Sequence, residues 1–119
     1  MQLKITGDFI DKTAENYGNN YVGGYAYSQT LSLMKTYVLL ANDDEIIAVA
    51  LGMSGEAKTD IRYKYAQLDS FAFKDGILAN KVVIKPAGGK KLELTVPKNT
   101  AGISDYQRKL SEFLKNKSK

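Results

Sequence analysis

The hydrophobic residues of this 119-residue chain change their spacing once, after a proline near the end. Up to Pro97, Leu92, Leu94 and Val96 alternate with polar residues, which is the pattern of a half-buried β-strand. Beyond it, the apolar residues fall on one stripe of an α-helix: Ile103, Tyr106, Leu110, Phe113 and Leu114. The spacing therefore predicts a series of strands followed by one amphipathic helix, with Ser104 and Gln107 as its capping box and a tail from Asn116 beyond it.

Further strands are predicted by alternation or by short apolar runs over residues 31–39, 46–51, 61–65, 71–73 and 82–85. Asn42-Asp43-Asp44 is a turn signal, so the first two of these strands form a hairpin. Ile61, Tyr63 and Tyr65 share an inward parity, whereas Leu68 falls out of phase with them. The chain must therefore bulge near Ala66-Gln67-Leu68 or bend there into a second sheet.

Residues 1–35 follow no clear period. Residues 3–6 alternate briefly, as in a short strand or a lead-in. The stretch from Tyr17 to Tyr27 holds four tyrosines among glycines and asparagines, which disfavour a helix. We interpret it as a twisted strand or loop whose rings cover one end of the core, with Gly23-Gly24 and Gly88-Gly89 as turn glycines. The alternative is an aromatic binding surface, for which Tyr21 and Tyr25 are the candidate residues.

The composition excludes the commonest catalytic and metal-binding groups. The chain contains neither histidine nor cysteine, which removes the usual general base, the thiolate nucleophile and the thiolate metal ligands. Asp43-Asp44-Glu45 lacks the spaced ligands of a calcium loop and is predicted to be a turn. No catalytic residue, metal ligand or cofactor is predicted.

The organisation of the sequence indicates one domain over residues 1–119, because no linker or repeat divides it. No apolar run is long enough to span a membrane, and the first residues lack the apolar region of a secretory signal. A cytoplasmic location is therefore expected.

Charge is distributed unevenly along the chain. The net charge is +4, but residues 1–60 carry four basic and eight acidic groups, so the remaining 13 basic and five acidic groups lie in residues 61–119. Five lysines lie on or beside three consecutive predicted strands: Lys74, Lys81, Lys85, Lys90 and Lys91. They form either a solvated face or a binding surface for an anionic partner. Only two arginines are present and the neighbouring tyrosines have inward parity, which disfavours nucleic acid.

The order of these elements resembles the bacterial pleckstrin-homology-like (PH-like) domain family over about residues 36–115. Residues 37–42 and 45–49 are similar to the hairpin of that family, with Ala41 and Asp44 in place of its customary threonine and basic residue. Residues 61–78, which read IRYKYAQLDSFAFKDGIL, are similar to a later stretch of the family. The resemblance implies a bent antiparallel sheet that forms two packed, near-orthogonal sheets, with the C-terminal helix in one open end. The expected fold is therefore mainly β (α+β), a PH-like barrel or sandwich capped by that helix.

The resemblance implies a small non-enzymatic interaction module that binds a protein or assembles with itself. The lipid-binding subset of the family uses a basic loop between its first two strands, whereas the early part of this chain is acidic. The alternative function is an anionic-surface or nucleic-acid binder that uses the basic second half.

Overall fold

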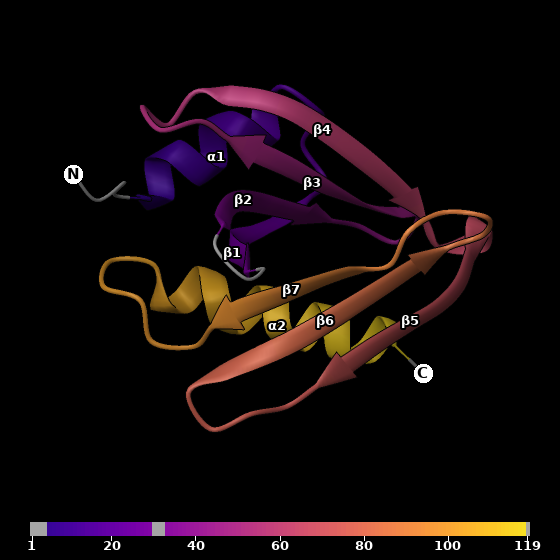
Figure 1. The fold of residues 1–119 in the computed structure, drawn as a ribbon. Helices are drawn as coiled ribbons and strands as arrows, with labels where there is room; N and C mark the ends of the chain where they lie inside the picture. The colour runs from indigo at the N-terminus through magenta and orange to yellow at the C-terminus, as the bar shows by residue number, and fades with distance from the viewer. Residues whose placement is uncertain (1–4, 30–32, 119) are drawn as a thin grey trace.

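The computed structural model describes residues 5–29 and 33–118, which form seven antiparallel strands and two α-helices (Figure 1). In chain order the elements are α1 (Gly7–Glu15), β1 (Val22–Gln29), β2 (Met34–Ala41), β3 (Glu45–Leu51), β4 (Ala57–Lys64), the short 3₁₀ helix η1 (Tyr65–Gln67), β5 (Leu68–Lys74), β6 (Ala79–Pro86), β7 (Leu92–Pro97) and α2 (Ser104–Lys117). The mainly β class with a C-terminal helix is confirmed.

All seven strands belong to one sheet in the order β4-β3-β2-β1-β7-β6-β5. The expected division into two sheets is not seen, because Tyr27 of β1 pairs with Thr95 of β7 and joins the halves. This is the one residue pair between the two strands, whereas β1 and β2 pair along their whole length. The sheet therefore consists of two halves, β1–β4 and β5–β7, with a narrow junction (Figure 1).

At the predicted phase change near Leu68, the chain passes from one edge strand of the sheet to the other. Residues Tyr65–Gln67 form η1, and the chain passes there from β4 at one edge to β5 at the other. The inward parity predicted for Tyr63 is confirmed, since its side chain is buried in the core. Ile61 has the same parity but is 49% exposed, because the core between the two halves does not extend to it.

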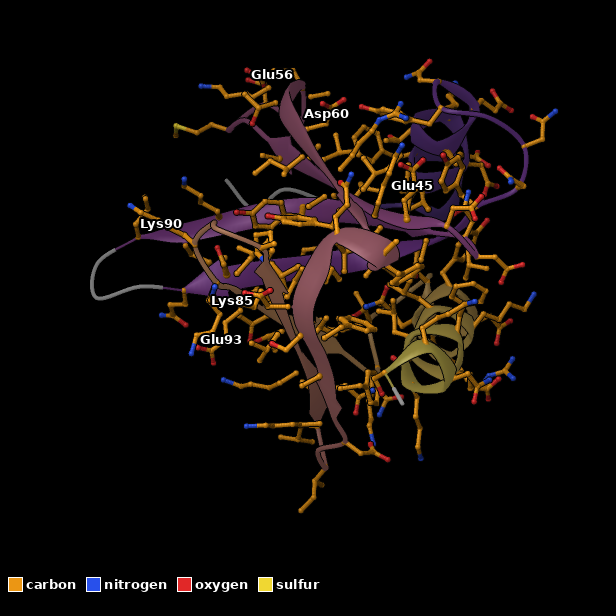
Figure 2. All side chains as sticks on the ribbon, turned by 90° about the vertical axis from the view of Figure 1, so that its right-hand side faces the viewer. Glu45, Glu56, Asp60, Lys85, Lys90 and Glu93 are labelled. Atoms are coloured by element: carbon orange, nitrogen blue, oxygen red, sulfur yellow. The ribbon has the colours of Figure 1, made fainter. Side chains whose placement is uncertain are left out.

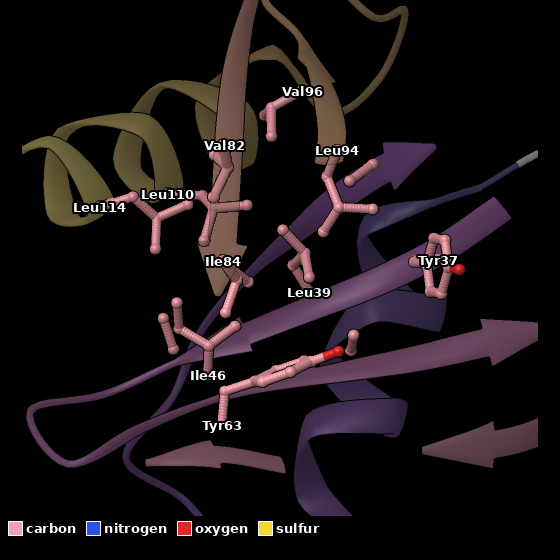
Figure 3. Packing of buried hydrophobic residues seen from close by; sticks show 13 residues of the cluster. Tyr37, Leu39, Ile46, Tyr63, Val82, Ile84, Leu94, Val96, Leu110 and Leu114 are labelled. Carbon is pink, nitrogen blue, oxygen red and sulfur yellow. The ribbon is translucent and has the colours of Figure 1, made fainter. Parts of the chain in front are cut away.

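The main core lies between the two halves of the sheet, which we call its inner side (Figure 3). Leu39, Ile46 and Tyr63 of the first half face Val82 and Leu94 of the second. The helix α2 packs on this core through Leu110 and Leu114, which are fully buried. The prediction that the terminal helix docks on the bent sheet is thus confirmed, although Phe113 and Tyr106 are only partly buried.

The predicted capping box of α2 is wrong. The Ser104 hydroxyl donates a hydrogen bond to the Thr100 carbonyl, and no side chain caps the helix N-terminus. Gln107 points into the protein and is fully buried. The helix also continues to Lys117, beyond the predicted start of the tail at Asn116.

Gln107 connects the two strands beside their narrow junction. Its Oε1 accepts from the Tyr25 amide of β1 at 2.7 Å, and its Nε2 donates to the Tyr25 carbonyl at 2.9 Å. The same Nε2 donates to the Pro97 carbonyl of β7 at 2.8 Å. A side chain of α2 therefore satisfies the Tyr25 amide and the Pro97 carbonyl, which would pair in a regular ladder, and also the Tyr25 carbonyl, for which Pro97 has no amide hydrogen.

The helix α1 falls in a segment where the sequence predicted none. Leu3 and Lys4 lie outside the described residues, and Thr6 is the N-cap of the helix, since its hydroxyl accepts from the Phe9 amide at 3.1 Å. The helix packs on the outer side of β2 and β3, where Ile10 joins a second core with Leu40 and Ile47. Both faces of these strands are buried, which explains their nearly continuous apolar sequences.

The pair Gly23-Gly24 is part of β1, not a turn as predicted. A Cβ atom on Gly23 would lie 2.7 Å from Ile10 of α1, and one on Gly24 would lie 2.6 Å from Leu110 of α2. The two glycines therefore let a helix approach each side of the strand closely. By contrast, Gly88 occupies a turn with a φ of 71°, in agreement with the sequence.

Candidate binding surface

The register of β5 and β6 places the predicted lysines on the outer side of the sheet. Phe73 and Val82 pair across the two strands and face the core, so the next pair, Lys74 and Lys81, faces outward. Lys85 has the same parity as Lys81 along β6. The helix α1 covers the outer side of β2 and β3, whereas α2 packs on the inner core, so neither covers these lysines.

Lys90 and Lys91 lie in the turn between β6 and β7, and Figure 2 shows Lys90 on the same side as Lys85. We call these five residues the lysine face: Lys74, Lys81, Lys85, Lys90 and Lys91. Two acidic residues also lie here, since Lys85 Nζ is 3.6 Å from an Asp69 oxygen and Lys91 Nζ is 3.8 Å from a Glu93 oxygen. These ion pairs are exposed and hold the side chains weakly.

Lys74 and Lys81 have a different environment, because neither forms an ion pair within the described part of the chain. They are directly opposite each other, and both are exposed. Like charges in such a cross-strand pair destabilise a sheet. The end of the lysine face that holds Lys74 and Lys81 thus carries uncompensated positive charge.

The candidate tyrosines lie elsewhere, so the structure does not bring them together with the lysine face. Tyr21 and Tyr25 pack against the second core between α1 and the first half of the sheet. The Tyr25 ring is 6.2 Å from that of Tyr27. The two rings therefore lie as expected for side chains that cover one end of a core.

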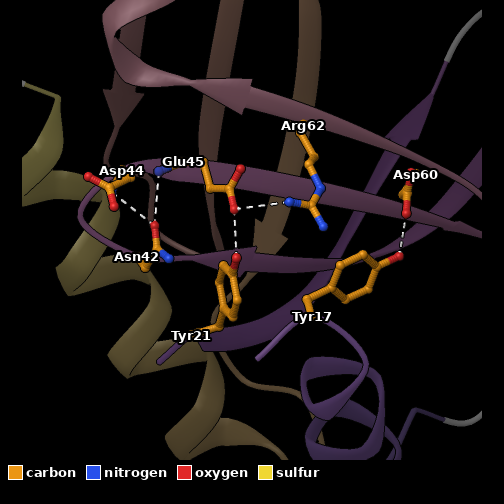
Figure 4. A network of polar contacts seen from close by, with 7 residues as sticks. All are labelled: Tyr17, Tyr21, Asn42, Asp44, Glu45, Asp60 and Arg62. Atoms are coloured by element: carbon orange, nitrogen blue, oxygen red, sulfur yellow. Dashed lines mark hydrogen bonds and ion pairs between the residues drawn. The ribbon is translucent and has the colours of Figure 1, made fainter. Parts of the chain in front are cut away.

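A polar network fastens the segment after α1 to the outer side of β3 and β4 (Figure 4). The Tyr21 hydroxyl donates to Glu45 at 2.6 Å, and Glu45 also lies 3.6 Å from Arg62. The Tyr17 hydroxyl donates to Asp60, while the Arg62 guanidinium lies 5.4 Å from the centre of the Tyr17 ring. Glu45 is 7% exposed, so its charge needs these two partners.

The tyrosines of this network hold their protons tightly. Burial and the hydrogen bond to Asp60 raise the pKa of Tyr17 to about 12. The hydrogen bond to Glu45, followed by burial, raises the pKa of Tyr21. Each phenol donates its proton to a hydrogen bond with a carboxylate. The two bonds hold the segment between α1 and β1 in position.

Replacing Tyr17 by phenylalanine is expected to reduce the loss of stability at alkaline pH. An unfolded tyrosine ionises near pH 10, whereas folded Tyr17 keeps its proton to about 12. The folded chain therefore binds more protons in this window, so its stability is complete below about pH 10 and falls as the pH rises toward 12. Urea unfolding at about pH 8 and about pH 11 measures this loss. A variant that loses as much stability as the parent over the same interval would contradict the assignment.

The acidic cluster of the sequence is dispersed in the structure. Asp43 lies 3.0 Å from Lys117, and Glu45 binds Tyr21 and Arg62. The amides of Asp44 and Glu45 both donate to the Asn42 side chain at 2.9 Å, which confirms the predicted turn. Within the described ranges, no three acidic side chains gather as metal ligands would.

Two surface features were missed by the sequence reasoning. A groove of about 450 Å³ lies beside α2, with charged residues of both signs along it, among them Asp75, Lys98 and Arg108. A wider groove of about 710 Å³ lies where β2 begins and β3 ends, next to Met34 and the 98% exposed Met53. The residues of each groove come from several elements and loops that are distant in the sequence, so the alternation within one strand does not reveal such grooves.

The strands and capping helix define a small β-sheet module whose candidate sites are the exposed lysine face and two surface grooves. A family model for the bacterial PH domain matches residues 18–103. The chain therefore belongs to the bacterial PH domain family, and the predicted resemblance is confirmed. A comparison with curated proteins finds no match. Neither described helix is long and apolar enough to cross a membrane.

Proposed function

We propose that this chain is a non-enzymatic protein-interaction module that binds an acidic segment of its partner on the lysine face. The observation that carries the proposal is the exposed pair Lys74 and Lys81, whose charges repel each other across two strands. A carboxylate placed between the two ammonium groups replaces this repulsion by attraction. A cytoplasmic location is part of the same proposal.

The residues between the lysines favour a protein over a nucleic acid. Ala72, Val83 and Thr95 occupy the neighbouring outward positions and offer no aromatic ring for a base to stack on. Asp69 and Glu93 interrupt the positive surface, which weakens its attraction for a dense row of phosphates. A partner with a few spaced carboxylates fits this pattern better.

An anionic membrane surface is the second candidate, and a separate observation favours it. Met34 and Met53 expose apolar side chains beside the wider groove, and Lys35 and Lys58 line the same groove. Apolar side chains flanked by lysines suit the boundary between lipid headgroups and acyl chains. This candidate uses the other half of the sheet, so one set of variants separates the two.

Replacing both Lys74 and Lys81 by glutamate is expected to weaken binding of a fluorescent deca-glutamate probe about tenfold or more, because two attractive contacts become repulsive. Fluorescence anisotropy at low salt measures the affinity, which should fall as salt screens the charges. The matched control replaces Lys12 and Lys109, which are exposed on the two helices, by glutamate. It changes the net charge equally and should retain most of the affinity.

Vesicles with anionic lipid and a single-stranded DNA of mixed sequence are the competing probes. Equal loss of affinity in the lysine-face variant and in the control would overturn the proposed site. Binding to vesicles that Met53→Ser abolishes, without binding to the acidic probe, would assign the function to the second candidate.

A further inference from the structure

The strand β4 leaves one side of its backbone without a partner. It is an edge strand, and Figure 1 shows it on the rim of the sheet. The Tyr65 amide donates to the Asp44 carbonyl, which continues the register in which Tyr63 faces Ile46. Because antiparallel bonds alternate along a strand, Thr59, Ile61 and Tyr63 direct their backbone groups to β3.

Asp60, Arg62 and Lys64 alternate with these residues and direct their amides and carbonyls away from the sheet, whereas Lys58 lies where the register with β3 shifts. No hydrogen bond among the described residues engages these outward groups. All four side chains are exposed as well. An uncovered edge of this kind is a template for pairing with another strand.

The sequence of β4 is complementary to itself when two copies run antiparallel. With Ile61 opposite Ile61 of a second copy, each Asp60 lies opposite the other Arg62. Asp60 and Arg62 are also residues whose backbone groups point outward, so the same register forms both the ion pairs and the backbone bonds. Ile61, which is 49% exposed, then meets its counterpart on the inner side.

Other registers are less favourable. A shift by one residue places an outward-directed backbone group opposite one that points back to β3, so no hydrogen bonds form. Only every second register is therefore allowed. The two nearest allowed registers place Asp60 opposite Asp60 or Arg62 opposite Arg62. The second of these also sets each Asp60 opposite Lys64, but it limits the pairing to residues 60–64, because β4 ends at Lys64. In the favoured register the like-charged pair of Lys58 and Lys64 lies at the two ends, where long side chains reach solvent.

We propose that two copies of this chain associate through their β4 strands, antiparallel and centred on Ile61. The alternating charges select a second copy as the occupant, because a uniformly acidic or basic strand would meet either Asp60 or Arg62 with like charge. Contacts within the chain already orient the two charged side chains, because the Tyr17 hydroxyl donates a hydrogen bond to Asp60 and Glu45 forms an ion pair with Arg62. The lysine face is at the other end of the strand order, so this inference does not rest on its binding function.

The pairing predicts a weak dimer with a dissociation constant of roughly 1 to 100 µM, as small interfaces give. Sedimentation velocity should show the 13.1 kDa chain shifting toward twice its mass as the concentration rises. Asp60→Arg and Arg62→Asp should each weaken self-association about tenfold or more, since each sets like charges opposite one another.

An equimolar mixture of the two charge variants is the decisive sample. Asp60→Arg in one chain then faces Arg62→Asp in the other, and the remaining Arg62 faces the remaining Asp60, so both ion pairs return. The mixture should dimerise about as tightly as the unmodified chain. Circular dichroism and the thermal midpoint verify that each variant is folded. Variants that dimerise alone, or folded variants that do not dimerise when mixed, would overturn the register.

A cysteine cross-link tests the centre of the pairing, because the chain has no cysteine of its own. In a pair without backbone hydrogen bonds the Cα atoms approach to about 4.5 Å, which a disulfide spans. Ile61→Cys should therefore form a covalent dimer under mild oxidation. Thr59→Cys, on the same face but opposite Tyr63 of the second copy, and the distant, exposed Ile77→Cys are the controls.

Equal cross-linking at positions 59, 61 and 77 would reveal random collision and contradict the proposal. A chain that remains monomeric at roughly ten times the expected dissociation constant would also contradict it. Neither result affects the deca-glutamate experiment, which uses the lysine face.

Discussion

Replacing Gln107 by leucine is expected to lower the free energy of unfolding by about 3 to 5 kcal/mol, although leucine is apolar and of similar size. The substitution leaves the Tyr25 amide, the Tyr25 carbonyl and the Pro97 carbonyl without their partner in a buried place. Water cannot replace the side chain easily where α2 packs tightly on β1. Each buried backbone group left unpaired costs about 1 to 3 kcal/mol, reduced by local relaxation.

Chemical denaturation of Gln107→Leu and of Arg108→Leu measures this effect against a neighbour. The Arg108 side chain is 60% exposed and pairs with Asp105 on the helix surface, so its loss should change stability by less than about 1 kcal/mol. An equally small change for Gln107→Leu would show that the three backbone groups find other partners.

The variant Gln107→Glu adds a dependence on pH. A protonated carboxyl group at this position can accept from the Tyr25 amide and donate to one carbonyl, whereas an ionised carboxylate faces two carbonyl oxygens. The folded state therefore favours the protonated form, and Gln107→Glu should lose stability as the pH rises from about 4 to 7. The stability of the unmodified chain over the same range is the reference.

The sequence predicted the elements whose evidence is local. Alternation and short apolar runs identified β2 to β7, the out-of-phase Leu68 located the crossing, and the apolar stripe located α2. The first of these strands was predicted from residue 31, but β2 begins at Met34 and residues 31–32 lie outside the described residues. The lysine face also followed from parity, because residues two apart on a strand share a side. These predictions need only the geometry of a single element and its neighbour.

The helix α1 was missed although the sequence holds two signals for it. Phe9, Ile10, Thr13 and Tyr17 have helical spacing after a capping Thr6. The apolar runs of β2 and β3 also require cover on both faces, and one helix at the C-terminus supplies only one. Because β1 contains two glycines and lacks clear alternation, the sequence did not indicate that α1 and β1 belong to the fold of the first half of the sheet.

The role of Gln107 and the tyrosine network depends on contacts between distant segments. Gln107 lies on the stripe of Ile103, Leu110 and Leu114, but its type suggests a cap rather than a buried connection. Its partners, Tyr25 and Pro97, are identified only by the way the sheet closes. Similarly, nothing in the sequence near Tyr17 indicates Asp60 as its acceptor.

Ending the chain after Gly102 is expected to abolish the cooperative fold, which is the largest effect that the structure predicts. The truncation removes Ile103, Leu110 and Leu114, each at most 1% exposed, and opens both cores. Burial of such side chains contributes roughly 1.5 to 3 kcal/mol each, so the sum is comparable to the whole stability of a small domain. Broad amide signals, dye binding or aggregation in place of a thermal transition would record the loss.

A shorter truncation separates the core of α2 from its surface. Ending the chain after Lys115 removes Lys117, which lies 3.0 Å from Asp43 and 5.7 Å from the centre of the Tyr65 ring. These exposed contacts contribute about 1 kcal/mol or less, so this variant should unfold cooperatively at a slightly lower midpoint. The sheet would then tolerate the loss of the last two residues of α2 but not of the buried stripe. A folded, monomeric chain that ends at Gly102 would instead show that β1 and β7 close without Gln107, and the helix would then be free to bind a partner.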